Sequence, residues 1–159
     1  MNEFDSHCQG LLTFLASWEP KLLALPEEVI AHRQNSQNRT IRQILGHLVD
    51  SASNNTHRII HLQNQPSPLH FPNYATHGNN DRWIAIQDYQ HEDWYTMVQL
   101  WKYANLHIIH VINNVDNSKL DNQWYYDETR LISLKEGIVD YLRHFKLHLA
   151  EIDDLIIQK

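Results

Sequence analysis

Four long segments of the sequence repeat apolar residues every three or four positions, and this pattern constrains the fold more than any other feature. The segments cover approximately residues 4–25, 40–62, 93–115 and 133–156. In a helix this spacing places the apolar side chains on one face. No segment shows a convincing strand-like alternation of apolar and polar residues. We therefore predict an all-α fold, a four-helix bundle that forms one domain across residues 1–159.

Two of these segments carry clear helix-start signals. Thr40 followed by Gln43, and Ser133 followed by Glu136, match the capping box that begins many helices. The connection between the second and third helices, residues 64–92, contains three prolines and is longer than an ordinary connection. We expect it to be a crossover or a lid, with a short helix near residues 82–86. The connection at residues 116–131 is expected to be irregular.

Composition limits the classes of function. Hydrophobic residues make up 42% of the chain and charged residues 20%, which is typical of a globular protein. The net charge of −6 argues against a nucleic-acid partner, because phosphate contacts need clustered Lys and Arg. No apolar run reaches the roughly 20 residues of a membrane span, and the first residues do not resemble a signal peptide. Cys8 is the only cysteine and lies on the apolar stripe, so we expect a buried thiol and a cytoplasmic protein.

Twelve histidines are the unusual feature of the composition, and helical geometry separates those that face the core from the others. His144 and His148 are four residues apart, so they share one face of the fourth helix, where they lie in or beside its apolar arc. His47 borders the apolar stripe of the second helix. His57 and His61 have the same spacing but fall on the polar side of their helix, and we expect them to be solvated.

Two histidines from one helix and a third from a neighbouring helix can bind one divalent ion. Neutral imidazoles are good donors near neutral pH, and three of them leave coordination positions open for chemistry. We therefore predict a metal site formed by His47, His144 and His148. The alternative is a structural bundle in which these are hydrogen-bonded core residues. Gly46 and Gly137 are expected to let the helices approach closely.

Polar residues near His47 are candidates for binding a substrate. Ser51, Asn54 and Arg58 lie within about 40° of His47 around the helix axis. Asn55 occupies a position that is otherwise apolar. Asn55 could instead make a structural hydrogen bond that sets the helix register, and Arg58 could be an ordinary surface charge.

Two further residues near the histidines have competing interpretations. Tyr141 lies one turn before His144 and could present its hydroxyl to a cavity as part of the substrate site, although packing is the favoured role. Asp50 lies one turn from His47 and could orient its imidazole. Because Asp50 turns away from the apolar arc, surface exposure is the favoured interpretation.

Several of these motifs occur in the same order in a known family. The run LGHLVD at residues 45–50, the run DYLRHFKLHLAEI at residues 140–152, the run DSASNNTHR at residues 50–58 and the helix around Trp101 resemble the DinB/YfiT-like metalloenzymes. The resemblance extends over residues 4–156. It implies a four-helix bundle with a divalent metal ion, commonly zinc or nickel, held by His47, His144 and His148. It also implies that a homodimer is common, and exposed Leu147 is available for such a contact.

The resemblance implies a small-molecule substrate, with a low-molecular-weight thiol as one candidate. Activities of similar proteins include thiol S-transfer and a thiol-dependent isomerisation, and others are regarded as metal-dependent hydrolases. A divalent ion can lower the pKa of water or bind a thiol as thiolate, so both chemistries remain open. Because Cys8 is expected in the core, the nucleophile is expected to come from outside the chain. We predict a metal-dependent enzyme that is thiol S-transferase-like or hydrolase-like; the alternative is a non-enzymatic metal- or ligand-binding bundle of a stress response.

Overall fold

The computed structural model describes residues 3–158 and confirms an all-α four-helix bundle. The four long helices are α1 (Asp5–Leu23), α3 (Ile41–Asn64), α5 (Trp94–Asn113) and α6 (Leu134–Ile157). Short helices lie in the connections: α2 (Glu27–His32), α4 (Asn79–Gln87), and the 3-10 turns η1 (Tyr89–His91) and η2 (Asn117–Lys119). Helix α4 includes the short helix that was expected near residues 82–86.

Both predicted capping boxes are present. The amide of Gln43 donates to the Thr40 hydroxyl at 3.3 Å, and the Thr40 amide donates to the Gln43 side chain at 3.0 Å. Ser133 and Glu136 form the same reciprocal pair at 3.2 and 2.7 Å. Because each box satisfies amides that the first turn of a helix leaves free, it fixes where α3 and α6 begin.

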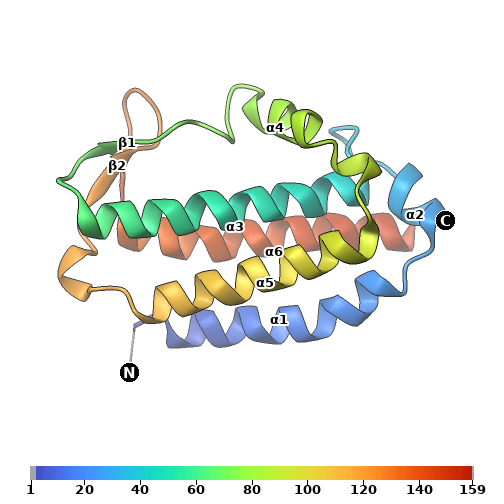
Figure 1. The fold of residues 1–159 in the computed structure, drawn as a ribbon, viewed down its shortest axis with the longest axis horizontal. Coiled ribbons are helices and arrows are strands. Elements are labelled where there is room, and N and C mark those ends of the chain that lie inside the picture. Colours follow the sequence, from blue (N-terminus) through green and yellow to red (C-terminus); the bar gives the residue numbers. More distant parts are fainter. Residues whose placement is uncertain (1–2, 159) are drawn as a thin grey trace.

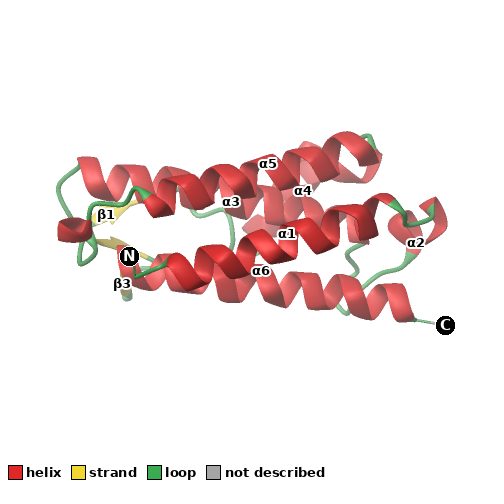
Figure 2. Ribbon diagram, turned by 90° about the horizontal axis from the view of Figure 1, so that it is seen from below, coloured by secondary structure: helices red, strands yellow, loops and turns green. Residues whose placement is uncertain are grey.

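The order of the helices in space differs from their order along the chain. Helix α3 packs against α5 and α6, and α1 packs against the same two helices. Helices α1 and α6 run in one direction, and α3 and α5 run in the opposite direction (Figures 1 and 2). Since α3 and α5 are parallel neighbours, the chain must return along the whole bundle between them. The connection at residues 65–93 is this crossover, and it carries α4 over one side of α3 (Figure 1).

A small three-stranded sheet lies at one end of the bundle, where the sequence predicted no strands. Strand β1 (Leu69–His70) from the crossover pairs in parallel with β2 (Gln123–Tyr125), which pairs antiparallel with β3 (Leu131–Ser133). Strands of two or three residues are too short for an alternating pattern to be visible in the sequence. The sheet joins the crossover to the hairpin that leads into α6.

Two of the helical glycines, Gly46 and Gly137, pack against aromatic rings of the connections and not, as was expected, against another long helix. A Cβ atom at Gly46 would lie 2.2 Å from the ring of Tyr89 in η1. A Cβ atom at Gly137 would lie 2.3 Å from the indole of Trp124 in β2. These glycines therefore let the crossover and the hairpin sit directly on α3 and α6.

The core contains the apolar faces of all four long helices, with Trp101 and Phe145 stacked at its centre at 5.9 Å between ring centroids. Cys8 is buried, as the sequence predicted. Among the described residues, no helix combines the length and apolarity that a membrane crossing requires.

Candidate metal centre

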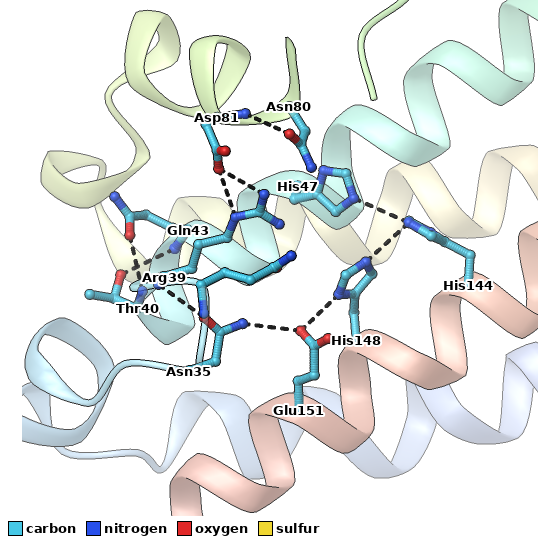
Figure 3. Close-up of polar contacts among 11 residues, drawn as sticks. Asn35, Arg39, Thr40, Gln43, His47, Asn80, Asp81, His144, His148 and Glu151 are labelled. Carbon is cyan, nitrogen blue, oxygen red and sulfur yellow. Dashed lines mark hydrogen bonds and ion pairs between the residues drawn. The ribbon is translucent and has the colours of Figure 1, made fainter. Parts of the chain in front are cut away.

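Three imidazoles converge where the middle of α6 faces the second turn of α3. The Nε2 atom of His144 lies 3.1 Å from Nε2 of His47 and 3.0 Å from Nε2 of His148 (Figure 3). One nitrogen from each ring lies within 4.8 Å of the other two. Within the described residues this is the one group of three or more His, Cys, Asp or Glu side chains with such spacing. The structure thus brings together the three histidines that the sequence singled out.

The far nitrogens of two of these rings are held by neighbouring side chains. His148 Nδ1 lies 3.0 Å from a carboxylate oxygen of Glu151, and His144 Nδ1 lies 3.3 Å from the Ser51 hydroxyl. A carboxylate accepts only, so His148 Nδ1 carries a proton, and Nε2 is the nitrogen that can bind a metal ion. His47 Nδ1 is buried and has no hydrogen-bond partner in the described part of the chain.

This hydrogen-bond pattern fits a cation at the point of convergence. If the Ser51 hydroxyl accepts from His144 Nδ1, the Nε2 lone pairs of His144 and His148 face each other at 3.0 Å. A proton on His47 could satisfy one of the two short contacts but not both. Two imidazoles bound tetrahedrally to zinc at about 2.0–2.1 Å have nitrogens roughly 3.3 Å apart, close to the separations seen here. The donor set therefore suits a divalent ion.

Burial keeps these rings in the form that binds metal. Loss of solvent, reinforced by the neighbouring imidazoles, lowers the pKa of His47 to about 2. The same causes lower the pKa of His144 to about 4. Because both rings stay neutral near pH 7, no proton has to be displaced before a metal ion binds.

Glu151 is a site residue that the sequence analysis missed. Its hydrogen bond to His148 lowers the pKa of the carboxyl group, so Glu151 is ionised near neutral pH. The Asn35 amide also donates to Glu151, at 3.3 Å (Figure 3). The sequence could have indicated this role, because Glu151 follows His148 by three residues and therefore lies on the same helix face. Carboxylates commonly orient metal-binding histidines in this way.

A cleft of about 280 Å³ opens beside the three histidines. Its floor comes from α3 and α6, and its walls come from the crossover and from the β2–β3 hairpin. Of the residues proposed for substrate binding, Ser51, Asn55, Arg58 and Tyr141 line this cleft. Asn54 is not among the lining residues, and its side-chain amide donates to the Asp50 carbonyl at 2.8 Å.

Arg58 is not the solvated surface charge that the alternative interpretation described. Its guanidinium carbon lies 5.1 Å from the centre of the Tyr74 ring and 5.6 Å from the centre of the Trp124 ring. Burial lowers its pKa. Asn55 has a structural hydrogen bond, since its amide donates to the Ser51 carbonyl at 2.9 Å, but it also faces the cleft. Neither aromatic partner was identified from the sequence, because both lie in the connections.

Tyr141 and Asp50 also have specific partners. The Tyr141 hydroxyl donates to the buried Asn105 side chain, so this group is engaged within the core although the ring borders the cleft. Asp50 was expected at the surface, and this was wrong, since only 2% of the residue is exposed. It accepts hydrogen bonds of 2.7 Å from the Tyr89 hydroxyl and the Gln87 amide. The crossover covers this flank of α3, which the pattern of α3 alone does not reveal.

The remaining pair with four-residue spacing behaves differently from the metal-site pair. His57 is exposed, as expected. His61 is half-buried, and its Nδ1 lies 2.8 Å from the Gln65 side chain. These two rings lie 6.1 Å apart, between centroids, without a third ligand nearby in the described structure. Spacing within one helix therefore does not create a site unless a second helix supplies a donor.

Comparison with known proteins identifies the fold. Neither the family models nor the curated proteins searched include a match to this chain. A solved structure does match: YfiT from Bacillus subtilis, described as a probable metal-dependent hydrolase with an unusual four-helix bundle topology. The TM-score is 0.83 at 18% sequence identity, and the match covers 98% of this chain and 86% of YfiT. This chain therefore has the DinB/YfiT-like four-helix-bundle fold.

Proposed function

We propose that this chain is a divalent-metal-dependent enzyme in which His47, His144 and His148 hold the ion. The observation that supports this most strongly is the convergence of three imidazole nitrogens, from buried His47 and His148 and half-buried His144, beside an open cleft. Two of these nitrogens lie 3.0 and 3.1 Å from the third. Zinc and nickel are the expected ions, because imidazole nitrogens suit both. When bound by three neutral ligands, such an ion supplies Lewis acidity that activates a water or a thiol.

The chain's own residues position the reactants. Glu151 and Ser51 hold His148 and His144 in fixed orientations through their Nδ1 atoms. We place the small-molecule substrate in the 280 Å³ cleft, in contact with Asn55, Arg58 and the ring edge of Tyr141. Asn54 does not line the cleft, and we propose that it supports the α3 part of the cleft floor through its hydrogen bond to the Asp50 carbonyl.

The nucleophile is expected to come from outside the chain. Ser51 lines the cleft but is only 1% exposed, and its hydroxyl is engaged with His144 Nδ1 at 3.3 Å. Cys8 is buried in α1 and is not among the residues that line the cleft. An external water makes the enzyme hydrolase-like, and an external low-molecular-weight thiol makes it thiol S-transferase-like. We propose both chemistries, because each would use a coordination position that three histidine ligands leave open.

The decisive experiment combines metal analysis with activity. Protein purified without a polyhistidine tag is expected to contain close to one equivalent of zinc or nickel. H144A and H148A are expected to lose the metal while keeping helical circular dichroism. Wild-type protein is then assayed against esters and amides, and against electrophiles with a panel of thiols, before and after chelation.

The outcomes separate the alternatives. Turnover that disappears on chelation and returns with metal supports the enzyme. Stoichiometric metal without turnover on any substrate would favour the non-enzymatic binding bundle. Unchanged metal content in H144A and H148A would refute the metal site itself.

We also propose that the protein is cytoplasmic and forms a homodimer. Leu147 on α6 is 48% exposed and is available for a contact between subunits. Sedimentation analysis of the wild-type protein and of L147E tests the dimer, which the substitution is expected to weaken.

A further inference from the structure

Three arginines line the cleft, and Arg58 differs from the other two. Arg39 is paired with Asp81 at 2.7 Å (Figure 3), and Arg143 is paired with Asp140 at 2.7 Å. Within residues 3–158, Arg58 has no carboxylate within ion-pair distance. Its positive charge is therefore available to something that enters the cleft.

The surroundings of Arg58 make an unpaired charge costly. The guanidinium carbon lies 5.1 Å from the centre of the Tyr74 ring and 5.6 Å from the centre of the Trp124 ring. These rings cover part of the half-buried Arg58, and burial lowers its pKa. The aromatic faces and the Tyr74 hydroxyl compensate part of this cost, but neutral groups do not balance a full charge. The flat guanidinium also carries N–H donors in a fork that matches the two oxygens of a carboxylate.

Arg58 lies at a useful distance from the candidate metal centre. The Tyr74 ring is centred 6.3 Å from the His47 ring and 5.1 Å from the Arg58 guanidinium carbon, so both groups neighbour the same aromatic ring. Both groups line the same cleft. A small molecule can therefore place one end at the histidines while its other end reaches Arg58.

We propose that Arg58 binds a carboxylate of the substrate, so that the substrate is a small carboxylic acid whose reactive group lies at the histidine end of the cleft. A single unpaired guanidinium matches the single charge of a carboxylate, whereas a phosphate dianion would keep an uncompensated charge beside two aromatic rings. The assignment to a substrate rests on the proposed function, but binding of the carboxylate to Arg58 does not require metal.

Benzoate and benzamide are matched probes for this subsite, because they have the same shape and differ in charge. Their dissociation constants are measured on the chelator-treated protein by nuclear magnetic resonance, with the Arg58 Nε–H and the Trp124 indole N–H as reporters. We expect benzoate to bind about tenfold more tightly than benzamide, as a charge-assisted hydrogen bond provides. In R58Q this preference should fall to within twofold, and in R143Q, the matched control on the same cleft, it should remain.

The competing outcomes are distinct. Equal affinities of the two probes for the wild-type protein, no benzoate binding at millimolar concentration, or a preference that survives R58Q would each overturn the proposal. If R58Q does not fold, the wild-type titration decides: a benzoate-specific shift at Arg58 supports the subsite, and one confined to Arg143 refutes it. Because metal is absent throughout, failure here is distinguishable from failure of the proposed enzyme, which appears as missing metal or missing turnover.

Discussion

Glu151 offers the sharpest test of how the protein holds the three histidines. Its carboxylate lies 3.0 Å from His148 Nδ1, and the side chain is 28% exposed. The substitution E151Q keeps an oxygen that can accept from His148 but removes the negative charge. We expect the fold to persist, because the residue contributes a polar contact at the edge of the core.

The size of the effect follows from this geometry. Losing the partner of a metal-binding histidine typically lowers metal affinity by about 10–100-fold, equivalent to roughly 1.4–2.8 kcal/mol. Because Gln can still accept a hydrogen bond and the site is partly open to solvent, E151Q should lie near the tenfold end. E151A removes the acceptor altogether and should lower the zinc affinity further.

The assay is a competition titration of chelator-treated protein against a chromophoric zinc chelator at pH 7.5. D154N is the matched control, since Asp154 is an exposed carboxylate on the same helix and should leave zinc affinity within twofold of wild type. If E151Q bound zinc as tightly as wild type while H148A lost binding, Glu151 would have no orienting role. An equal loss in D154N would show that only the charge of α6 matters.

Three further predictions concern stability, measured by urea denaturation. G137A should lower the free energy of unfolding by about 1–3 kcal/mol, because the added Cβ would lie 2.3 Å from the Trp124 indole in β2. The control G10A places its Cβ where no heavy atom lies within 4 Å, so it should be neutral or stabilising by about 0.5–1 kcal/mol. Similar values for both variants would refute the close contact at Gly137. D50A should cost about 1–3 kcal/mol, because it removes the carboxylate oxygen that accepts from both the buried Tyr89 hydroxyl and the Gln87 amide. An unchanged urea midpoint would contradict this. Chelator-treated protein should lose stability as the pH falls below about 6.5, since burial lowers the pKa of folded His47 to about 2 while the unfolded ring still takes up a proton near 6.5. The folded pKa of His144, about 4, adds a second such ring. The slope should therefore approach about 2.8 kcal/mol per pH unit, about 1.4 for each ring, and equal unfolding free energies at pH 7 and 5.5 would refute it.

Features that depend on neighbours three or four residues apart could be predicted from the sequence. The starts of α3 and α6 follow from the capping boxes at Thr40 and Ser133, which are local hydrogen bonds. The common face of His144 and His148 follows from helix geometry. The apolar stripes predicted an all-α bundle, because each stripe must be buried against another helix.

Features that depend on distant segments were decided by the tertiary structure. His47 meets His144 only because α3 packs against α6, and no local pattern specifies which helices become neighbours. Asp50 is buried because η1 of the crossover covers it, and Arg58 is desolvated because Tyr74 and Trp124 arrive from two separate connections. The periodicity of apolar residues indicates which face of a helix is buried. Which segment covers that face depends on packing between parts of the chain that are far apart in sequence.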